Sequence, residues 1–370
     1  MIFLIFSSIE FLLWFLPIFL IVYGITPRKY RNLTLLVGSI VFYAMGDAGN
    51  LAPLMISVLC NYFIGLHLAK RSPRTLWRKR LLFVTALSIN IGILIWFKCR
   101  GGSAGLPLGI SFYTFQLIAY LMDTYRAKCE DQTFFEYLQF MCFFPRFLQG
   151  PIVLQEDFIP QLRAENRSIL SYDHLGRGLY SFALGLGKKV LLADSLAKIV
   201  SQGYADVAAL NSTEALLIMV CYSLQLYFDF SGYCDMASGI ALMFNVNLPV
   251  NFHSPYKAAS ISEFWDRWHM TLTRFFTRYV YIPLGGSRKG TARTLLNIMI
   301  IFLLSGFWHG TNWTFLVWGA LHGLCMVFER VTGYEKWKLP HMLKVAWNFM
   351  LTTFAWSIFR AESLSQAGQL

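Results

Sequence analysis

The sequence is poor in charged residues. Asp, Glu, Lys and Arg make up 14% of its 370 residues, whereas a soluble globular domain carries roughly 25%. Hydrophobic residues make up 56%, and a soluble fold of this size has too little charged surface to cover so much apolar material. The composition therefore excludes a disordered chain, disfavours an ordinary soluble enzyme and predicts an integral membrane protein.

Several familiar chemical motifs are absent. The seven cysteines form no C-x-x-C pair, and their odd number argues against both a disulfide framework and a zinc site. The chain contains no G-x-x-x-x-G-K-[ST] phosphate loop, no G-x-S-x-G elbow and no H-E-x-x-H pair. We therefore expect no nucleotide hydrolysis, no serine-esterase chemistry, no bound metal and no bound cofactor.

Long apolar stretches are abundant. A spanning helix needs about 20 largely apolar residues, and candidates lie at 3–25, 33–45 with its flanks, 51–69 and 81–97. Further apolar stretches lie at 107–122, 134–155, 176–193, 214–228, 236–250, 295–328 and 343–359. We expect an all-α, polytopic membrane protein with one domain over 1–370. It is expected to have about nine to eleven membrane helices, together with re-entrant or interfacial ones.

The excess of positive charge indicates membrane orientation rather than nucleic-acid binding. The formal net charge is +12. Under the positive-inside rule, three basic clusters agree on one topology, in which each cluster is cytoplasmic and the N-terminus lies outside. We expect this charge to contact anionic lipid of the inner leaflet of the cytoplasmic membrane. The clusters are Arg28, Lys29 and Arg31; Lys70, Arg71, Arg74, Arg78, Lys79 and Arg80; and Arg126 and Lys128.

The segment 259–290 places charged residues beside aromatic ones. Ser260 and Glu263 have the S-x-x-E spacing of a capping box, which predicts that a helix begins there. Helical spacing gives this helix a charged face and an aromatic face, a pattern typical of a helix lying in the membrane interface. The two faces are Glu263, Arg267, Arg274 and Arg278, and Trp265, His269, Leu272 and Phe276.

The apolar stretch 295–328 is interrupted in its middle by SGFWHGTNW. Its halves hold 14 and 16 residues, about 21–24 Å as helices and short of a ~30 Å hydrocarbon core. Basic residues flank the stretch, so both ends are expected to be cytoplasmic, with His309 at a turn sunk into the membrane. Polar backbone at that depth is tolerated only where it lines an enclosed or water-filled cavity.

His309 is the strongest candidate for chemistry among the seven histidines. An ionisable group inside the membrane is costly and by default marks a functional site. His309 stands beside Trp308 and Asn312, and a neutral imidazole can accept a proton from a hydroxyl and return it to a leaving group. The residues alone leave catalysis and a hydrogen-bonded structural role open for His309 and His269. His322 is expected to be a packed helix-face histidine.

Polar residues also interrupt the apolar run QLYFDFSGYCDMASGIAL. We expect two buried carboxylates there in a network that lines a cavity; the alternative is a helix break held together by side-chain hydrogen bonds. These residues are Gln225, Asp229, Ser231, Tyr233 and Asp235. A second polar set lies near an expected break between Pro145 and Pro151. Its members are Gln116, Asp123, Arg126, Arg146 and Gln149.

Four segments, in order, resemble the membrane-bound O-acyltransferase family. They are SFYTFQLIAYLMDTYR, QLYFDFSGYCDMASGIAL, EFWDRWHMTLTRFFTRYVYIPLGG and GFWHGTNWTFLVWGALHG. The nearest branch is the alginate O-acetyltransferase membrane subunit, with its relatives that act on other bacterial envelope polysaccharides. The resemblance extends from FSSIEFLLWFLPIFLIVY to FAWSIFRAESL, and so covers nearly the whole chain.

The resemblance implies a ring of membrane helices around a thin central region, with a funnel reaching in from the cytoplasm. It implies that His309, in W-H-G, is the essential histidine and that His269, in F-W-x-R-W-H, is the second one. Arg146 stands where relatives often have histidine, and Asp266 where a second arginine is common. Relatives usually continue beyond the position of Leu370, so we expect either a short member or one whose C-terminal membrane helices are absent.

From the residues and the resemblance together we expect O-acyl transfer. A cytoplasmic thioester donor, acetyl-CoA or an acyl carrier, enters the funnel, where His309 acts as general base and His269 positions the donor or stabilises the oxyanion. Trp265, Trp268 and Trp308 exclude water. The acetyl group then reaches a polysaccharide hydroxyl through a periplasmic or extracellular acetyltransferase partner. The expected supporting residues are Arg267, Asn312, Gln225, Asp229, Ser231, Tyr233 and Asp235.

Three other functions stay open on the sequence. One is transfer of D-alanine from a carrier protein for teichoic acid modification. Another is a non-catalytic conduit for acyl groups or lipids, which needs the same wet cavity. The third is a sterol- or lipid-modifying acyltransferase.

Overall fold

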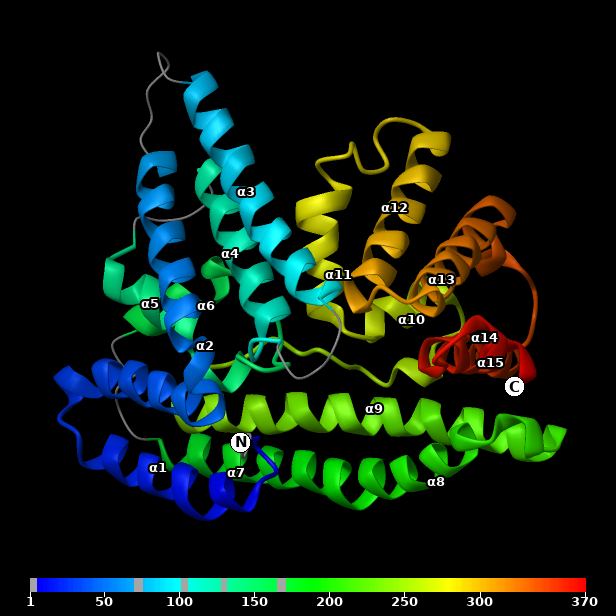
Figure 1. Ribbon diagram of the computed structural model, residues 1–370, viewed down its shortest axis with the longest axis horizontal. Helices are drawn as coiled ribbons and strands as arrows, with labels where there is room; N and C mark the ends of the chain where they lie inside the picture. Colours follow the sequence, from blue (N-terminus) through cyan, green and yellow to red (C-terminus); the bar gives the residue numbers. More distant parts are fainter. Residues whose placement is uncertain (1–4, 70–75, 101–105, 128–131, 165–170) are drawn as a thin grey trace. The chain divides into compact units, whose positions relative to one another are not determined.

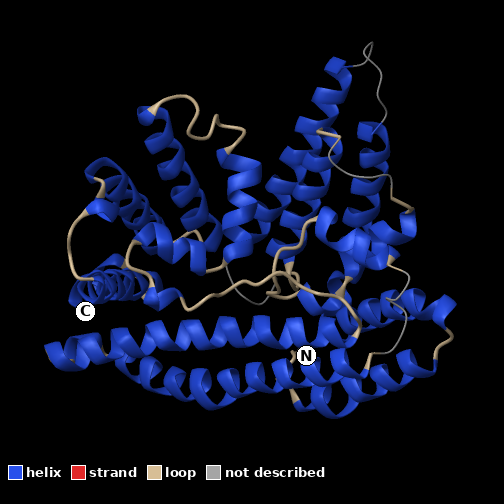
Figure 2. Cartoon of the chain, turned by 180° about the vertical axis from the view of Figure 1, so that it is seen from behind, coloured by secondary structure: helices blue, strands red, loops and turns tan. Residues whose placement is uncertain are grey.

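The computed structural model describes residues 5–69, 76–100, 106–127, 132–164 and 171–370. Within these ranges every regular element is a helix (Figure 2). One isolated β-bridge joins Phe252 and Trp268. The expected all-α class is confirmed. Five segments in the described ranges are long and apolar enough to cross a membrane: Arg28–Ala69, Leu76–Cys99, Ser212–Met243, Thr291–His309 and Trp313–Thr332. The larger expected number of membrane helices stays a prediction.

The chain divides into two compact units. Unit 1 consists of Met1–Leu186 and Tyr233–Pro249, and unit 2 of Gly187–Gly232 and Val250–Leu370. The long helix α9 (Ser212–Met243) contributes to both, because the boundary falls inside it at Gly232. The expectation of a single domain over 1–370 stays a prediction.

Unit 1 is built around α2, which packs against α3, α4 and α5 (Figure 1). Helix α4 also packs against α3, and α5 against α6. The helices are α1 (Leu16–Ile25), α2 (Arg31–Ala69), α3 (Leu76–Cys99), α4 (Ile110–Tyr125), α5 (Phe134–Cys142), α6 (Gln155–Arg163) and most of α7 (Tyr172–Gly187).

The gap between the expected spans 33–45 and 51–69 coincides with a kink inside α2. Asp47 has non-helical dihedral angles, φ −156° and ψ 68°, and the helix continues on both sides of it. Its carboxylate accepts the Asn50 side-chain amide at 2.9 Å and the backbone N–H of Leu108 at 2.9 Å. The two spans expected at 33–45 and 51–69 are therefore two helical segments of α2, which meet at a kink where a buried carboxylate holds the backbone of a distant loop.

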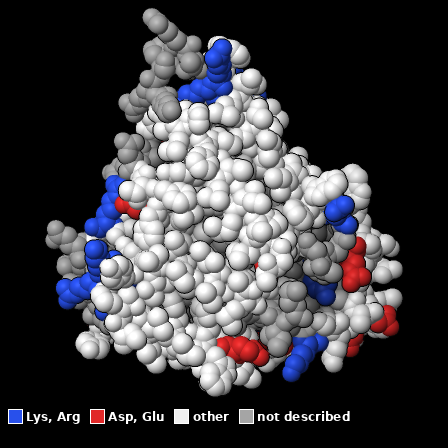
Figure 3. Space-filling view, turned by 60° about the vertical axis from the view of Figure 1, so that its left-hand side comes forward, with Lys and Arg blue, Asp and Glu red and all other residues white. Residues whose placement is uncertain are grey.

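The basic clusters are described only in part. Lys70, Arg71, Arg74 and Lys128 lie outside the described residues, whereas Arg78, Lys79 and Arg80 belong to the first turns of α3. Farther along α3, apolar side chains such as Leu81, Ile89 and Trp96 are exposed. Figure 3 shows a face whose centre carries almost no charge, with Lys and Arg gathered at its margins. This distribution is typical of a surface that contacts lipid.

Unit 2 contains an antiparallel helical hairpin, α12 and α13, against which α14 packs. Small residues let the two hairpin helices approach closely: a Cβ atom on Gly306 would collide with the carbonyl oxygen of Phe315, and one on Gly319 with that of Phe302. The helices are α8 (Asp194–Ala205), α10 (Ile261–Arg267), α11 (Met270–Phe276), α12 (Thr291–His309), α13 (Trp313–Thr332), α14 (His341–Arg360) and α15 (Leu364–Gln369), together with part of α9.

The two hairpin helices are longer than the apolar stretch suggests. Polar residues extend α12 to 19 residues and α13 to 20, about 28–30 Å each. The expectation that each half of the hairpin is too short to cross the hydrocarbon core of a membrane is therefore wrong. The turn itself is where it was predicted, at residues 310–312. The depth of His309 in the membrane stays a prediction.

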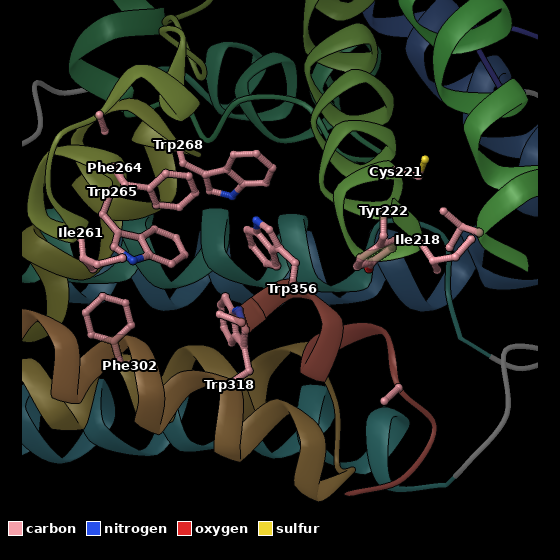
Figure 4. Packing of buried hydrophobic residues seen from close by; sticks show 14 of the residues in the cluster. Ile218, Cys221, Tyr222, Ile261, Phe264, Trp265, Trp268, Phe302, Trp318 and Trp356 are labelled. Carbon is pink, nitrogen blue, oxygen red and sulfur yellow. The ribbon is translucent and has the colours of Figure 1, made fainter. Parts of the chain in front are cut away.

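An aromatic cluster fills the core of unit 2 (Figure 4). Trp318 is fully buried, and its ring stacks on that of Trp356 with centroids 5.5 Å apart. Trp356 in turn contacts Trp268 at 5.0 Å, and Trp265 contacts Trp318 at 5.9 Å. Trp265 belongs to α10, and Trp268 is the residue that follows this helix. Trp318 belongs to α13 and Trp356 to α14. The cluster therefore joins the hairpin to the segment that carries His269.

Candidate active site

His309 is the last residue of α12, and the helix ends there because Gly310 continues in an extended conformation. The imidazole is half-buried. Its centroid lies 5.3 Å from that of Trp318 and 4.9 Å from that of Phe359, both in edge-on geometry. The following turn is held by Asn312, whose side-chain amide donates to the carbonyl of Glu362 at 2.6 Å. The hairpin thus presents an accessible histidine on an aromatic wall.

The segment expected to be one interfacial helix is broken at His269. Ser260 caps α10 as predicted, with its hydroxyl accepting the N–H of Glu263 at 3.0 Å. The predicted pairing of Glu263 with Arg267 is also present, at 2.6 Å. However, His269 adopts φ 45° and ψ 49°, so α10 and α11 are separate helices. The expectation of a continuous helix is wrong.

The left-handed conformation of His269 costs about 1–3 kcal/mol in a residue with a side chain. Tertiary hydrogen bonds hold it. The carbonyl of Asn251 accepts the N–H of Met270 at 3.0 Å, and the N–H of His253 donates to the carbonyl of Arg267 at 2.9 Å. A short extended segment, 251–253, therefore pairs with the break and determines where His269 points.

Asn251 also determines the tautomer of His269. Its Oδ1 accepts the backbone N–H of Thr271 at 3.1 Å, which identifies that atom as oxygen rather than nitrogen. The His269 Nδ1, 3.1 Å from the same oxygen, must therefore carry the proton and donate. His269 Nε2 then has a lone pair, and this buried atom has no hydrogen-bond partner in the described part of the chain.

Burial lowers the pKa of His269 to about 3, so the ring is neutral near pH 7. A neutral ring with a lone pair on Nε2 accepts hydrogen bonds there and does not donate them. Of the two roles expected for His269, positioning a substrate group fits this tautomer. Stabilising an oxyanion does not, since that role requires an N–H at the free ring nitrogen.

His322 is buried on the face of α13, as expected, and it is also hydrogen-bonded. Its Nδ1 accepts the indole N–H of Trp265 at 3.3 Å. Its ring and that of His309 both contact Trp318, with centroid distances of 5.1 and 5.3 Å. A chain of ring contacts connects His269 with His309. It runs through Phe230, Phe252, Trp268, Trp356 and Trp318.

A cavity of about 230 Å³ lies between α10, α11, α12 and α13. Trp265 and Phe302 form part of its wall. Ser305, one helical turn before His309, and Thr273, one turn after His269, also line it. The wall surface is mostly apolar, and it also includes several hydroxyl groups and the charged residues Asp266 and Arg330, as in pockets for small organic groups. The cavity therefore begins one turn away from each candidate histidine.

The other residues expected near these histidines have distinct positions. Trp308 is half-buried beside His309, with ring centroids 4.4 Å apart. Trp268 is buried in the aromatic cluster, 5.0 Å from Phe252. Arg267 pairs with Glu263 at 2.6 Å. Of the expected tryptophans, Trp265 is the one that lines the cavity.

The expected network in 225–242 does not form as predicted. Helix α9 is continuous through this region, so the helix break is wrong. Asp229 is 42% exposed and pairs with Lys189 at 2.7 Å, and Asp235 is half-buried, so neither is the buried carboxylate expected.

The same residues also divide between the two units. Gln225, half-buried, and Ser231, buried, belong to unit 2 with Asp229. Tyr233 and Asp235 belong to unit 1. In unit 1, Tyr233 stacks on Phe6 with centroids 5.0 Å apart. The polar residues of this one helix thus belong to both units.

The structure adds two residues that the sequence did not single out. Asn251 holds His269, and Phe230 on α9 packs edge-on against the His269 ring with centroids 4.7 Å apart. In the described ranges, no three His, Cys, Asp or Glu side chains gather closely enough to hold a metal ion.

Comparisons with known proteins agree on one family. The model of the membrane-bound O-acyltransferase family matches residues 35–361. The chain is 37% identical to the peptidoglycan O-acetyltransferase of Helicobacter pylori, over 98% of this chain and 78% of the relative. It is 38% identical to the probable alginate O-acetylase AlgI of Pseudomonas fluorescens, over 99% and 74%. A teichoic acid D-alanyltransferase of Streptococcus thermophilus is 31% identical, over 60% and 56%.

Proposed function

Because this chain belongs to the membrane-bound O-acyltransferase family and is therefore an acyltransferase, we propose that it moves an acetyl group to hydroxyl groups of an envelope or exported polysaccharide. Relatives over nearly the whole chain are named O-acetyltransferases of peptidoglycan or alginate. The observation that carries the proposal is the placement of His309, half-buried at the hairpin turn and one helical turn from a cavity-lining serine.

The proposed donor is a cytoplasmic thioester, acetyl-CoA. His309 takes the proton of the acceptor hydroxyl as its oxygen attacks the thioester carbonyl. The tetrahedral intermediate collapses, the C–S bond breaks, and the protonated His309 returns the proton to the departing thiolate. An ester C–O bond replaces the C–S bond, with no net change in protons on the enzyme.

His269 has a different part in this proposal. Its Nε2 lone pair accepts a hydrogen bond from an O–H or N–H group of the bound substrate other than the reacting hydroxyl and so orients the substrate, while Asn251 holds the ring. The apolar cavity receives the acetyl group and part of the chain that carries it. Trp265 and Trp308 exclude water, which would otherwise hydrolyse the thioester.

We further propose that the enzyme lies in the cytoplasmic membrane and delivers acetyl groups outward. The basic residues that begin α3 support a cytoplasmic position for that end of the helix. A periplasmic or extracellular acetyltransferase partner then carries the group to the polysaccharide. Transfer of D-alanine is the second candidate, supported by the more distant teichoic acid relatives.

The test is ester-linked acetate on envelope polysaccharides, released by mild base from cells that express wild type or His309→Ala at matched membrane levels. His341→Ala is the matched control, because His341 is an exposed histidine at the start of α14. We expect the acetate to disappear with His309→Ala and to be unchanged with His341→Ala. Acetate that persists in His309→Ala would refute acyl transfer by His309 and favour a conduit. Ester-linked D-alanine, measured in the same extracts, decides between the two acyl groups.

A further inference from the structure

Arg146 is a buried charge in unit 1 without a counter-charge among the described residues. It ends a short 3₁₀ turn, Phe144–Arg146, and is 5% exposed. Both Nη1 and Nη2 are buried and have no hydrogen-bond partner there. None of the described ion pairs involves this side chain. A guanidinium that is buried without an opposite charge lowers the stability of the fold, because it gives up its hydration and no anion compensates for the loss.

The surroundings hold the guanidinium in one orientation. Its carbon lies 4.5 Å from the ring centroid of Phe140 and 5.3 Å from that of Phe158. These cation–π contacts come from α5 and α6, the two helices on either side of the Arg146 turn. The backbone is held as well, because the N–H of Gly150 donates to the carbonyl of Arg146 at 3.2 Å. The aromatic rings thus position the group but leave Nη1 and Nη2 without a hydrogen-bond acceptor among the described residues.

A small cavity lies beside this arginine. Its volume is about 20 Å³, and it is lined by Arg146 together with Gln116, Tyr113 and Gly150, among others. This volume has room for one or two oxygen atoms. The lining contains no carboxylate, so the chain itself supplies no anion at this point. Gly150, which lines the cavity, packs closely on the backbone of Arg146, since a Cβ atom there would collide with the Cα of Arg146.

We propose that Arg146 forms a binding site for an oxyanion, the phosphate of a lipid headgroup or of a free solute, whose oxygen atoms enter this cavity and pair with Nη1 and Nη2. The planar fork of a guanidinium matches two oxygens of a phosphate, which a lysine ammonium cannot do. The site lies wholly in unit 1 and is independent of the acyl-transfer proposal. It gives a buried arginine a function at a position where an uncharged side chain would fill the same space at a lower cost in folding free energy.

The test compares wild type with Arg146→Met, which keeps the volume and removes the charge, and with Arg146→Lys, which keeps the charge and loses the fork. Arg177→Met is the control, since the Arg177 side chain is 69% exposed on α7 in the same unit. Each purified protein, stripped of lipid in neutral detergent, is heated with inorganic phosphate or with chloride at equal ionic strength. A second series replaces phosphate with phosphatidylglycerol or with an uncharged detergent of the same chain length.

We expect phosphate, phosphatidylglycerol or both to raise the unfolding temperature of wild type and of Arg177→Met by about 3 °C or more. Arg146→Met is expected to show no such rise, and Arg146→Lys a smaller one. Without any anion, Arg146→Met is expected to unfold at the wild-type temperature or above, because the uncompensated charge is gone. A response to the lipid alone identifies a headgroup site, and a response to phosphate alone identifies a solute site.

The proposal is wrong if wild type and Arg146→Met respond equally, or if neither responds to any phosphate-bearing probe. It is also wrong if Arg146→Met is less stable than wild type to the same extent under every condition. That result would mean that Arg146 contributes to stability only through the packing of its side chain. Should Arg146→Met fail to fold, the phosphorus that co-purifies with wild type and with Arg146→Lys gives a second measurement. We expect more bound phosphorus per protein in wild type, and equal amounts would also refute the site.

Discussion

His309 and His269 are held in place by different kinds of structure. His309 ends a regular helix, and close packing of α12 on α13 through glycines determines its position. His269 lies at a strained break, and hydrogen bonds from Asn251 determine both its position and its tautomer. One ring is half-exposed and the other buried. An accessible ring such as that of His309 can transfer protons as a base. A buried ring in a fixed orientation, such as that of His269, can serve as a hydrogen-bond acceptor.

The largest effect expected is on activity, from exchanging the two histidines for glutamine. Glutamine accepts a hydrogen bond through Oε1 but cannot take up a proton. We therefore expect His309→Gln to lose about 10³-fold in acetate transfer, and His269→Gln about 10²-fold or less. Ester-linked acetate per unit of membrane protein measures both. A larger loss from His269→Gln than from His309→Gln would reverse the roles assigned here.

The packing of the hairpin is tested by Gly306→Ala. The added methyl group collides with the carbonyl of Phe315, so we expect about 2–3 kcal/mol of destabilisation and a lower unfolding temperature in detergent. Gly187→Ala is the control, because nothing lies within 4 Å of a Cβ atom there. That variant is expected to be neutral or slightly more stable. Equal unfolding temperatures for the two variants would show that close helix packing does not position His309.

The hydrogen bonds at the break are tested by Asn251→Ala and Asn251→Asp. The alanine variant removes the oxygen that accepts from His269 and from the N–H and hydroxyl of Thr271. We expect it to lose about 2 kcal/mol of stability, together with acetate transfer. The aspartate variant keeps the acceptor, so it is expected to retain more stability than the alanine variant. An alanine variant as stable and active as wild type would mean that His269 holds its position without Asn251.

The low pKa of His269 predicts a pH-dependent contribution to stability. Its folded-state pKa, about 3, lies below the ordinary value of 6.5, so the unfolded chain binds one more proton between these values. Stability is therefore lost as pH falls from 6.5 toward 3, by up to about 1.4 kcal/mol per pH unit from this group. Replacing His269 with Gln is expected to make the acid-induced loss shallower over this window, as measured by unfolding temperature. If the unfolding temperatures of wild type and His269→Gln fell equally steeply with pH, the His269 ring would protonate in the folded protein without loss of stability. The fold would then not hold the ring neutral.

The smallest effect expected is that of Trp265→Phe. This change keeps the ring in the aromatic cluster and removes the indole N–H that donates to His322. The loss is expected to be about 1 kcal/mol, seen as a small decrease in unfolding temperature. Activity is expected to fall only slightly, because the cavity wall stays apolar. A large loss of activity without loss of stability would assign His322 a direct part in the site.

Local signals in the sequence predicted local structure well. The Ser260 cap and the Glu263–Arg267 pair are contacts over three and four residues, and both are present. The interruption around His309 predicted the hairpin turn, because glycine and asparagine between apolar runs end helices. The lengths of α12 and α13 were underestimated, since helix continues into polar residues that an apolar count omits.

Contacts between distant residues decided the rest. Nothing near His269 in the sequence marks a helix break, because the acceptor that stabilises it is Asn251, 18 residues away. The carboxylates of Asp229 and Asp235 were expected to be buried, but their exposure depends on what packs against α9 rather than on their apolar neighbours in the sequence. Arg146 was noted as a polar residue near a proline, and only the packing of Phe140 and Phe158 shows it to be a buried charge.

By itself the sequence determined the class of the protein: helical, membrane-embedded and an O-acyltransferase, with His309 at a turn. Composition and short-range patterns carry the helical and membrane-embedded class and the turn, because helix caps, apolar runs and turn residues act through neighbours in the chain. The acyltransferase class came from the four segments that resemble the family. The tertiary structure alone decided the backbone and tautomer of His269, the partners of the acidic residues and the burial of Arg146. These features depend on hydrogen bonds and packing between segments that are far apart in the sequence. Patterns among neighbouring residues do not predict such contacts.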